Sequence, residues 1–332
     1  MATSGTQLIE KSLWAEPDVI ADMERALGGV APAMEIDVRV SADGAFFVSH
    51  DATTPSGKTI GASVESQLVD AVRLRLALDV LAANPGKHLV VELKSLGDTA
   101  AQSDNAMRFK EAVAAARVAE RITVSSLSPS ILLAVHRVWP EVPLILNAGI
   151  VPVLSYPSGW FGRWLANRLH ASRGGYLRLG LRGRYAVLAT GEGALEYPHV
   201  KGADGSAGDV MYALTELPPQ LLSVLQDQAS RGVPFGGAVS VATVTAYCNG
   251  LRRLPFLKGY ASRISRQAIA AVHAQGVNVQ TTTWGAINSK ATVADWQPAA
   301  QLTRLFAVGI GPCDMVYTRG IDAALLAVGK GE

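Results

Sequence analysis

The segment AMEIDVRVSADGAFFVSHD, residues 33–51, places two acidic side chains inside an apolar run. The alternating valine and isoleucine residues predict a β-strand, and alternate residues of a strand point to the same face. Glu35 and Asp37 therefore share one face, about 6 to 7 Å apart along the strand. Two like charges so close repel each other and lose water, so a positive group is expected between them. A structural Arg or Lys would serve, and so would a metal ion.

The rest of the sequence alternates short apolar runs with segments of helical periodicity. The predicted strands are residues 6–11, 33–40, 88–94, 121–126, 142–149, 234–241, 277–284 and 314–318. The predicted helices are residues 17–27, 66–83, 105–119, 128–139, 218–232, 265–276, 294–309 and 320–329. Eight strands that mostly alternate with helices are typical of an α/β TIM (β/α)8 barrel, and a doubly wound open sheet is the alternative.

Composition is consistent with one large globular barrel. The chain has 332 residues, of which 49% are hydrophobic and 17% charged. Its net charge of +2 lacks the strong positive charge that is typical of nucleic-acid-binding domains. Two domains would also fit the length, but the β/α order favours a single barrel over residues 1–332 with an insertion over 150–215. The two cysteines lack zinc or disulfide spacing. No signal peptide or long apolar run is present, so a cytoplasmic protein is expected.

The barrel hypothesis brings the acidic side chains together with a second pair. Glu92 and Lys94 lie at the end of the next barrel strand, at positions i and i+2, so they also share a face. Active sites of TIM barrels lie at the carboxyl ends of the strands. If both faces point inward, Glu35, Asp37 and Glu92 form a set of oxygen ligands suited to Mg²⁺ or Ca²⁺. The alternative is an ion-pair network with Lys94 and Arg39.

Five segments, taken in order, resemble one known family. MEIDVRVSADGAFFVSHDATT, residues 34–54, is similar to the glycerophosphodiester phosphodiesterase signature, in which Glu-x-Asp precedes an Asp-Gly turn, a short hairpin strand and a His-Asp pair. Further segments resemble later motifs of that family: LVVELK (89–94), RITVSSLSPSILLAVHRVWPEVPLIL (121–146), GVNVQTTTWGAIN (276–288) and CDMVYTRGI (313–321). The resemblance covers most of the chain outside residues 150–215.

The resemblance implies roles for individual residues. Glu35, Asp37 and Glu92 would bind the divalent cation, and His50 would act as the general acid or base. Lys94 would contact the phosphate or hold Glu92. Trp284 either forms a wall of the substrate pocket or fills the core.

One motif of the family is replaced in this sequence. The family opens with His-Arg-Gly at the end of the first strand, where this chain has Glu10, Lys11 and Ser12, and no histidine precedes His50. Lys11 could bind phosphate as a point charge, and Glu10 could transfer a proton or bind the metal. Adjacent strand residues face opposite sides, so at most one of the two points inward while the strand stays regular.

The insertion at 150–215, which follows the fifth predicted strand, is basic and aromatic. Six arginines lie between Arg163 and Arg184, and no acidic residue lies between Glu141 and Glu192. A helical apolar stripe accompanies them. Residues 158–185 are therefore interpreted either as a helix packed on the barrel with a solvated basic face, or as a lid or an interfacial helix that meets a phospholipid or other anionic substrate, with peripheral membrane contact.

These features predict a metal-dependent phosphodiester enzyme of the glycerophosphodiester phosphodiesterase-like superfamily. Its substrate would be a glycerophosphodiester-like, lipid or sugar phosphodiester, and hydrolysis is the first expectation. Because the first histidine is missing, a synthase, a transferase or a lyase that cyclises through a hydroxyl of the substrate is an alternative. A non-catalytic barrel that binds a phosphorylated ligand is the second alternative.

Overall fold

The structure is a computed structural model of the 332-residue chain. The residues that it describes are 6–11, 19–98, 100–147, 149–150, 178–179, 185–186, 194–196, 210–212, 217–242, 258–283, 298–311, 313–318 and 321.

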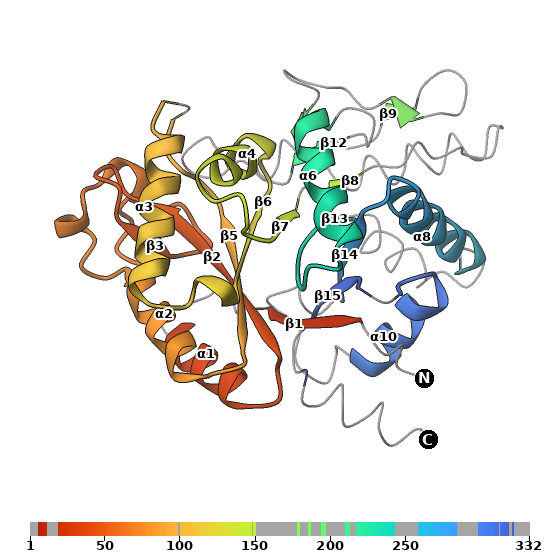
Figure 1. Ribbon diagram of the computed structural model, residues 1–332, viewed down its shortest axis with the longest axis horizontal. Coiled ribbons are helices and arrows are strands. Elements are labelled where there is room, and N and C mark those ends of the chain that lie inside the picture. Colours follow the sequence, from red (N-terminus) through yellow and green to blue (C-terminus); the bar gives the residue numbers. More distant parts are fainter. Residues whose placement is uncertain are drawn as a thin grey trace.

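Parallel strands of the described chain close into a barrel, which confirms the predicted TIM architecture (Figure 1). In order around the barrel they are β1 (Gln7–Lys11), β2 (Ala33–Val40), β5 (His88–Leu93), β6 (Ile122–Ser126), β7 (Leu144–Leu146), β13 (Ala238–Ser240), β14 (Asn278–Thr282) and β15 (Met315–Thr318). Strand β1 pairs in parallel with both β15 and β2, so the sheet closes and the open doubly wound alternative is wrong.

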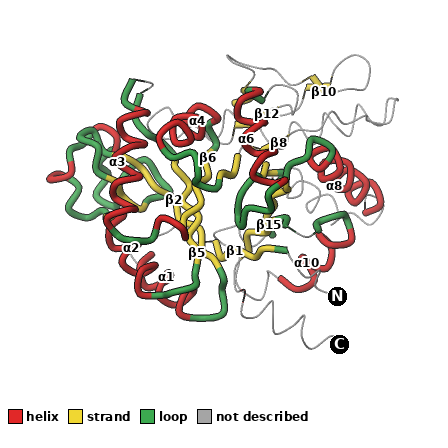
Figure 2. Tube along the Cα trace, in the orientation of Figure 1, coloured by secondary structure: helices red, strands yellow, loops and turns green. Residues whose placement is uncertain are grey.

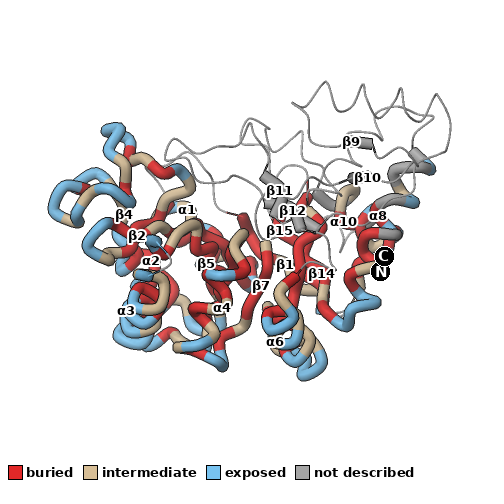
Figure 3. Tube along the Cα trace, turned by 90° about the horizontal axis from the view of Figure 1, so that it is seen from above, coloured by how far each residue is buried: buried red, intermediate tan, exposed pale blue. Residues whose placement is uncertain are grey.

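Helices surround the strands, as Figure 2 shows in red around yellow. The described helices are α1 (Val19–Gly28), α2 (Leu74–Ala83), α3 (Gln102–Ala115), α4 (Pro129–Val138), α6 (Pro219–Ser230), α8 (Lys258–His273) and α10 (Pro298–Ala307). Their apolar faces pack on the outside of the barrel strands, and buried residues concentrate where helix and strand meet (Figure 3). The helices thus bury the outer face of the sheet, and the side chains inside the barrel bury its inner face.

The helix predicted over residues 66–83 begins later than expected. Only Leu74–Ala83 is α-helical, and Val72–Arg73 forms the short strand β4, which pairs antiparallel with β3 (Phe46–Val48). Arg73 has an extended backbone, with φ −71° and ψ 139°. Pairing with β3 therefore overrides the helical periodicity of the segment, as tertiary contacts often override local propensity.

The barrel interior has an apolar layer below a polar one. The apolar layer consists of Ile9, Ala33, Val90, Ile145, Ala238, Met315 and Tyr317. Two residues further along five of these strands, on the same face, the residues are Lys11, Glu35, Glu92, Asn147 and Ser240. The strands thus place polar side chains together at their carboxyl ends, above the apolar layer.

A hairpin extends the barrel next to β2. Strand β3 pairs antiparallel with β2 after a turn in which Ser41 Oγ donates a hydrogen bond of 2.6 Å to Asp43 Oδ1. Gly44 has φ +88°, a left-handed conformation that glycine adopts without steric cost. Beyond β3, Ser49 N donates to the carbonyl of Asp37 at 2.9 Å. This hairpin returns the chain to the level of Asp37 just before His50.

The amino-terminal end of the barrel is closed by an aromatic contact. The imidazole of His88 stacks on Phe235, with ring centroids 4.6 Å apart, and its Nε2 lies 2.8 Å from Thr123 Oγ1. Thr123 Oγ1 donates to the carbonyl of Phe235 at 3.0 Å, so His88 Nε2 carries the hydrogen that Thr123 accepts. Burial lowers the pKa of His88 to about 4.

The low pKa of His88 predicts acid sensitivity of the fold. The unfolded chain takes up a proton on His88 near its ordinary pKa of 6.5, whereas the folded chain does so near 4, so stability is lost as pH falls between these values. Between pH 7 and pH 5 this group should contribute a loss of about 2 kcal/mol in the free energy of unfolding. Urea unfolding of the parent and of His88→Gln at both pH values measures it, because the variant lacks this group alone. Equal losses in both proteins would contradict the assignment.

The predicted insertion at 150–215 contains several short described strands. Strand β8 (Gly149–Ile150) pairs with β12 (Val210–Tyr212), which pairs with β11 (Ala194–Glu196), and β9 (Arg178–Leu179) pairs with β10 (Tyr185–Ala186). The insertion thus follows β7, the fifth barrel strand. Residues 158–177, which carry the predicted apolar stripe, lie outside the described residues. None of the described helices combines the length and apolar character needed to cross a membrane.

Candidate active site

Three carboxylates meet at the carboxyl ends of β2 and β5. Glu35, Asp37 and Glu92 are at most 3% exposed, and one oxygen of each lies within 4.8 Å of the others. Register explains this arrangement, because Asp37 lies directly opposite Glu92 in the parallel pair and Glu35 lies two residues earlier on the same face. The structure thus brings together the three residues predicted as metal ligands.

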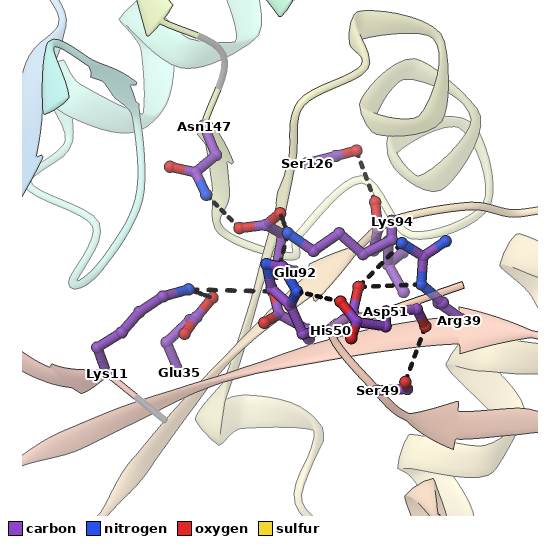
Figure 4. A network of polar contacts seen from close by, with 12 residues as sticks. Lys11, Glu35, Arg39, Ser49, His50, Asp51, Glu92, Lys94, Ser126 and Asn147 are labelled. Carbon is purple, nitrogen blue, oxygen red and sulfur yellow. Dashed lines mark hydrogen bonds and ion pairs between the residues drawn. The ribbon is translucent and has the colours of Figure 1, made fainter. Parts of the chain in front are cut away.

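Two lysines neutralise part of this charge (Figure 4). Lys11, opposite Glu35 in the pairing of β1 with β2, forms an ion pair with Glu35 Oε1 and lies 4.0 Å from Asp37 Oδ1. Lys94 forms an ion pair with Glu92 Oε1 and lies 3.1 Å from Asp37 Oδ1. When all three carboxylates are ionised, they and the two ammonium groups leave one negative charge.

The buried charges perturb one another strongly. Burial raises the pKa of Glu35 to about 8, although Lys11 opposes that rise. Burial also disfavours the ionised form of Asp37, but the Lys11 and Lys94 ammonium groups outweigh it and hold the pKa of Asp37 below its usual range. The pKa of Lys94 is raised, because the attraction of Asp37 and Glu92 exceeds the effect of burial. Perturbed groups of this kind concentrate at functional sites.

His50 lies at the edge of the cluster, on the segment that follows β3. Its Nδ1 is 2.9 Å from Asp51 Oδ1, and its carbonyl accepts hydrogen bonds from Arg39 Nε at 3.2 Å and Nη2 at 2.9 Å. Its side chain is 31% exposed, and the imidazole is near enough to Asp37 to help lower the pKa of that carboxyl group. His50 thus combines access to solvent with a position beside the carboxylates. Arg39 holds the backbone of His50.

Glu10 and Lys11 point to opposite sides of β1. Lys11 enters the barrel, as described above. Glu10 is 4% exposed, its Oε2 accepts a hydrogen bond from Ile321 N at 3.0 Å, and its Oε1 lies 4.0 Å from Arg25 Nη2 on α1. The structure therefore does not bring Glu10 to the carboxylate cluster, because β1 remains regular through both residues.

Sequence reasoning did not identify Asn147, which follows β7. Its Nδ2 donates a hydrogen bond to Glu92 Oε2, so both oxygens of Glu92 have a partner. A signal was present, since a single polar residue ends a strand of apolar residues at the carboxyl edge of the barrel. Trp284, the predicted wall of the pocket, lies outside the described residues.

The residues present suit a hard divalent cation. Carboxylate oxygens are the ligands that Mg²⁺ and Ca²⁺ prefer. Glu35 Oε2 is buried and accepts no hydrogen bond from any residue that the structure describes. An ionised oxygen in that state costs free energy unless a cation lies nearby. With its three carboxylates ionised, the cluster also keeps one net negative charge after both lysines are counted.

Comparisons with known proteins identify the fold. No protein-family model and no curated protein matches this sequence significantly. A solved glycerophosphodiester phosphodiesterase from Parabacteroides distasonis superposes with a TM-score of 0.54 and 13% identity, over 99% of this chain and 99% of that chain. An assigned glycerophosphoryl diester phosphodiesterase from Silicibacter pomeroyi superposes with a TM-score of 0.51 and 16% identity, over 99% and 95% of the two chains. A phosphodiesterase from Oleispira antarctica, solved with its product sn-glycerol-3-phosphate, superposes with a TM-score of 0.53 and 14% identity, over 97% of this chain and 96% of that chain. The chain thus has the fold of these enzymes, as the motif resemblance implied.

Proposed function

We propose that this chain is a divalent-metal-dependent enzyme that cleaves a phosphodiester of the glycerophosphodiester type. The observation that carries the proposal is the convergence of Glu35, Asp37 and Glu92 within 4.8 Å at the carboxyl end of the barrel. The fold shared with solved phosphodiesterases supports it.

Each residue of the site has a proposed chemical role. Glu35, Asp37 and Glu92 would hold the cation, Mg²⁺ or Ca²⁺, which would supply positive charge to the phosphate group. Lys94 holds Glu92 and Asp37 in place and adds positive charge where negative charge develops. His50 donates a proton to the leaving alcohol oxygen, with Asp51 orienting the imidazole through Nδ1.

Phosphorus NMR of the reaction products tests the proposal. The chain is incubated with glycerophosphodiesters, lysolipids and sugar phosphodiesters, each with Mg²⁺, with Ca²⁺ and with a chelator. Hydrolysis gives a phosphomonoester only in the presence of metal. A panel in which every diester stays intact, although a phosphorylated ligand binds in the presence of the chelator, favours the non-catalytic barrel.

A second outcome, transfer of the phosphoryl group to a hydroxyl of the substrate, has one observation in its favour. The described histidines other than His50 lie elsewhere in the fold: His88 at the amino-terminal end of the barrel, His136 on α4 and His273 on α8. In the described structure His50 therefore has no second imidazole beside it to activate water. A hydroxyl of the substrate held near phosphorus would attack it and expel the leaving alcohol, which gives a cyclic phosphodiester, whereas the hydroxyl of a second molecule would give a transferred phosphodiester. Phosphorus NMR distinguishes both products from a monoester.

Glu10 is proposed as an anchor between β1 and the segment at Ile321, not as a proton-transfer group. Glu10→Gln should leave turnover within about twofold of the parent, since its carboxylate faces away from the cluster, and should lower the free energy of unfolding by about 1 to 3 kcal/mol. Steady-state kinetics and thermal unfolding measure the two effects. A loss of turnover as large as that caused by replacing His50 would contradict the anchor role and support a proton-transfer role for Glu10.

A further inference from the structure

The ammonium group of Lys11 lies against two of the three proposed metal ligands. It forms an ion pair with Glu35 Oε1 and lies 4.0 Å from Asp37 Oδ1, while its side chain is 9% exposed. Two carboxylates this close favour the charged form of the lysine side chain. A buried monovalent cation therefore already lies at the place where a divalent one would bind.

Electrostatic repulsion sets the Lys11 ammonium group and a divalent metal ion in competition for the carboxylate of Glu35. A metal ion bound by Glu35 and Asp37 would lie next to the Lys11 ammonium, and like charges at contact distance in a buried site repel strongly. Lys94 differs, because Glu92 Oε1 and Asp37 Oδ1 both face it and Asn147 takes the other oxygen of Glu92. Lys11 thus has one close carboxylate partner, Glu35, whereas Lys94 has two. Glu35 also keeps a second buried oxygen, Oε2, that accepts no hydrogen bond from any described residue.

We propose that Lys11 is a displaceable counter-cation: it neutralises Glu35 until a divalent metal binds, and the metal then releases its ammonium group toward the phosphate of the substrate. This inference rests on the proposed function. The flexible four-carbon stem of lysine permits the movement. In its present position Lys11 Nζ also lies over the Tyr317 ring, 5.8 Å from the ring centroid, so displacement has to replace this cation–π contact as well as the ion pair.

Displacement couples the metal to the phosphate ligand. With its three carboxylates ionised, the cluster carries one net negative charge. A divalent metal makes it one net positive charge, and a phosphodiester monoanion brings it to zero. Metal binding frees a cation that the phosphate needs, so each ligand should raise the affinity for the other by the same factor. A site in which Lys11 stays on Glu35 would show no such contribution from Lys11.

Calorimetric titration with MgCl₂ or CaCl₂ alone, at pH 8.5, tests the competition without any measurement of activity. Lys11→Met should bind the metal about 10-fold more tightly than the parent, within the 5- to 150-fold range usual for coupled sites. Lys11→Arg keeps the charge and should resemble the parent. Lys110→Met, on α3 with its Nζ bonded to the carbonyl of Val138, removes one charge far from the cluster and should also match the parent.

Titration of sn-glycerol-3-phosphate into the same proteins tests the release of Lys11. In the parent, saturating metal should raise the affinity for this probe, and in Lys11→Met about 10-fold of that gain should be lost. If Lys11→Met does not fold without metal, Lys11→Gln replaces it, because its amide can still donate to Glu35.

The outcomes separate this inference from the proposed function. Equal or weaker metal affinity of the neutral Lys11 variants overturns the inference alone. Absence of metal binding by the parent overturns the metal-dependent function and the inference with it. Tighter metal binding by Lys11→Met, with parent-like binding by Lys11→Arg and Lys110→Met, supports the displacement.

Discussion

Glu35→Gln is expected to abolish metal-dependent turnover while leaving the fold intact. The amide keeps the shape of the side chain and can still accept a hydrogen bond from Lys11, but it removes one of the three negative charges that would hold a divalent cation. Metal affinity should fall by more than the roughly 10- to 100-fold that loss of a residue supporting a ligand costs. Calorimetric titration with Mg²⁺ and Ca²⁺ measures the loss, and far-UV circular dichroism checks the fold.

The matched control for Glu35→Gln is Glu111→Gln, on the exposed side of α3. It makes the same chemical change outside the barrel mouth, so metal affinity and turnover should equal those of the parent. If Glu35→Gln binds either metal as tightly as the parent, the assignment of the three carboxylates as metal ligands is wrong. Their role would then be to form ion pairs with Lys11 and Lys94.

His50→Ala is expected to lower turnover by about 10²- to 10⁴-fold, the usual contribution of general acid–base catalysis. Metal affinity should change little, because His50 lies on the segment after β3 and not among the three carboxylates. Initial rates at saturating metal, measured with a substrate that has a poor leaving alcohol, show the full effect. A substrate with a good leaving group, such as a nitrophenyl diester, should lose less, since such an oxygen leaves without a proton.

His136→Ala, on α4, provides the control for removal of an imidazole and should keep parental turnover. Asp51→Asn should give a smaller loss than His50→Ala, because it weakens the orientation of the ring but leaves its nitrogens. Parental turnover in His50→Ala with both substrates would contradict the acid–base role.

Strand periodicity predicted the barrel because each inner strand is a short apolar run with a polar end. Residues two apart share a face in any regular strand, so the pairs Glu35 with Asp37 and Glu92 with Lys94 followed from spacing alone. Their convergence needed only the closure of the barrel, which brings the carboxyl ends of the strands to one mouth.

Spacing could not decide between Glu10 and Lys11. Strand periodicity places them on opposite faces, and the face that points inward depends on the register of β1 against β2 and β15, which is a tertiary property. Asn147 was missed for a related reason, since its contact to Glu92 joins residues far apart in the chain. The sequence of residues 66–73 has helical periodicity, but its last two residues form β4 in the structure because they pair with β3.

The hairpin that carries His50 has a consequence for how such a site evolves. The proposed metal ligands lie on barrel strands, whose positions the whole fold determines, whereas His50 lies on a segment held by the Asp43–Gly44 turn and by Arg39. Insertions between β3 and β4 would therefore change the position of the imidazole without moving a carboxylate.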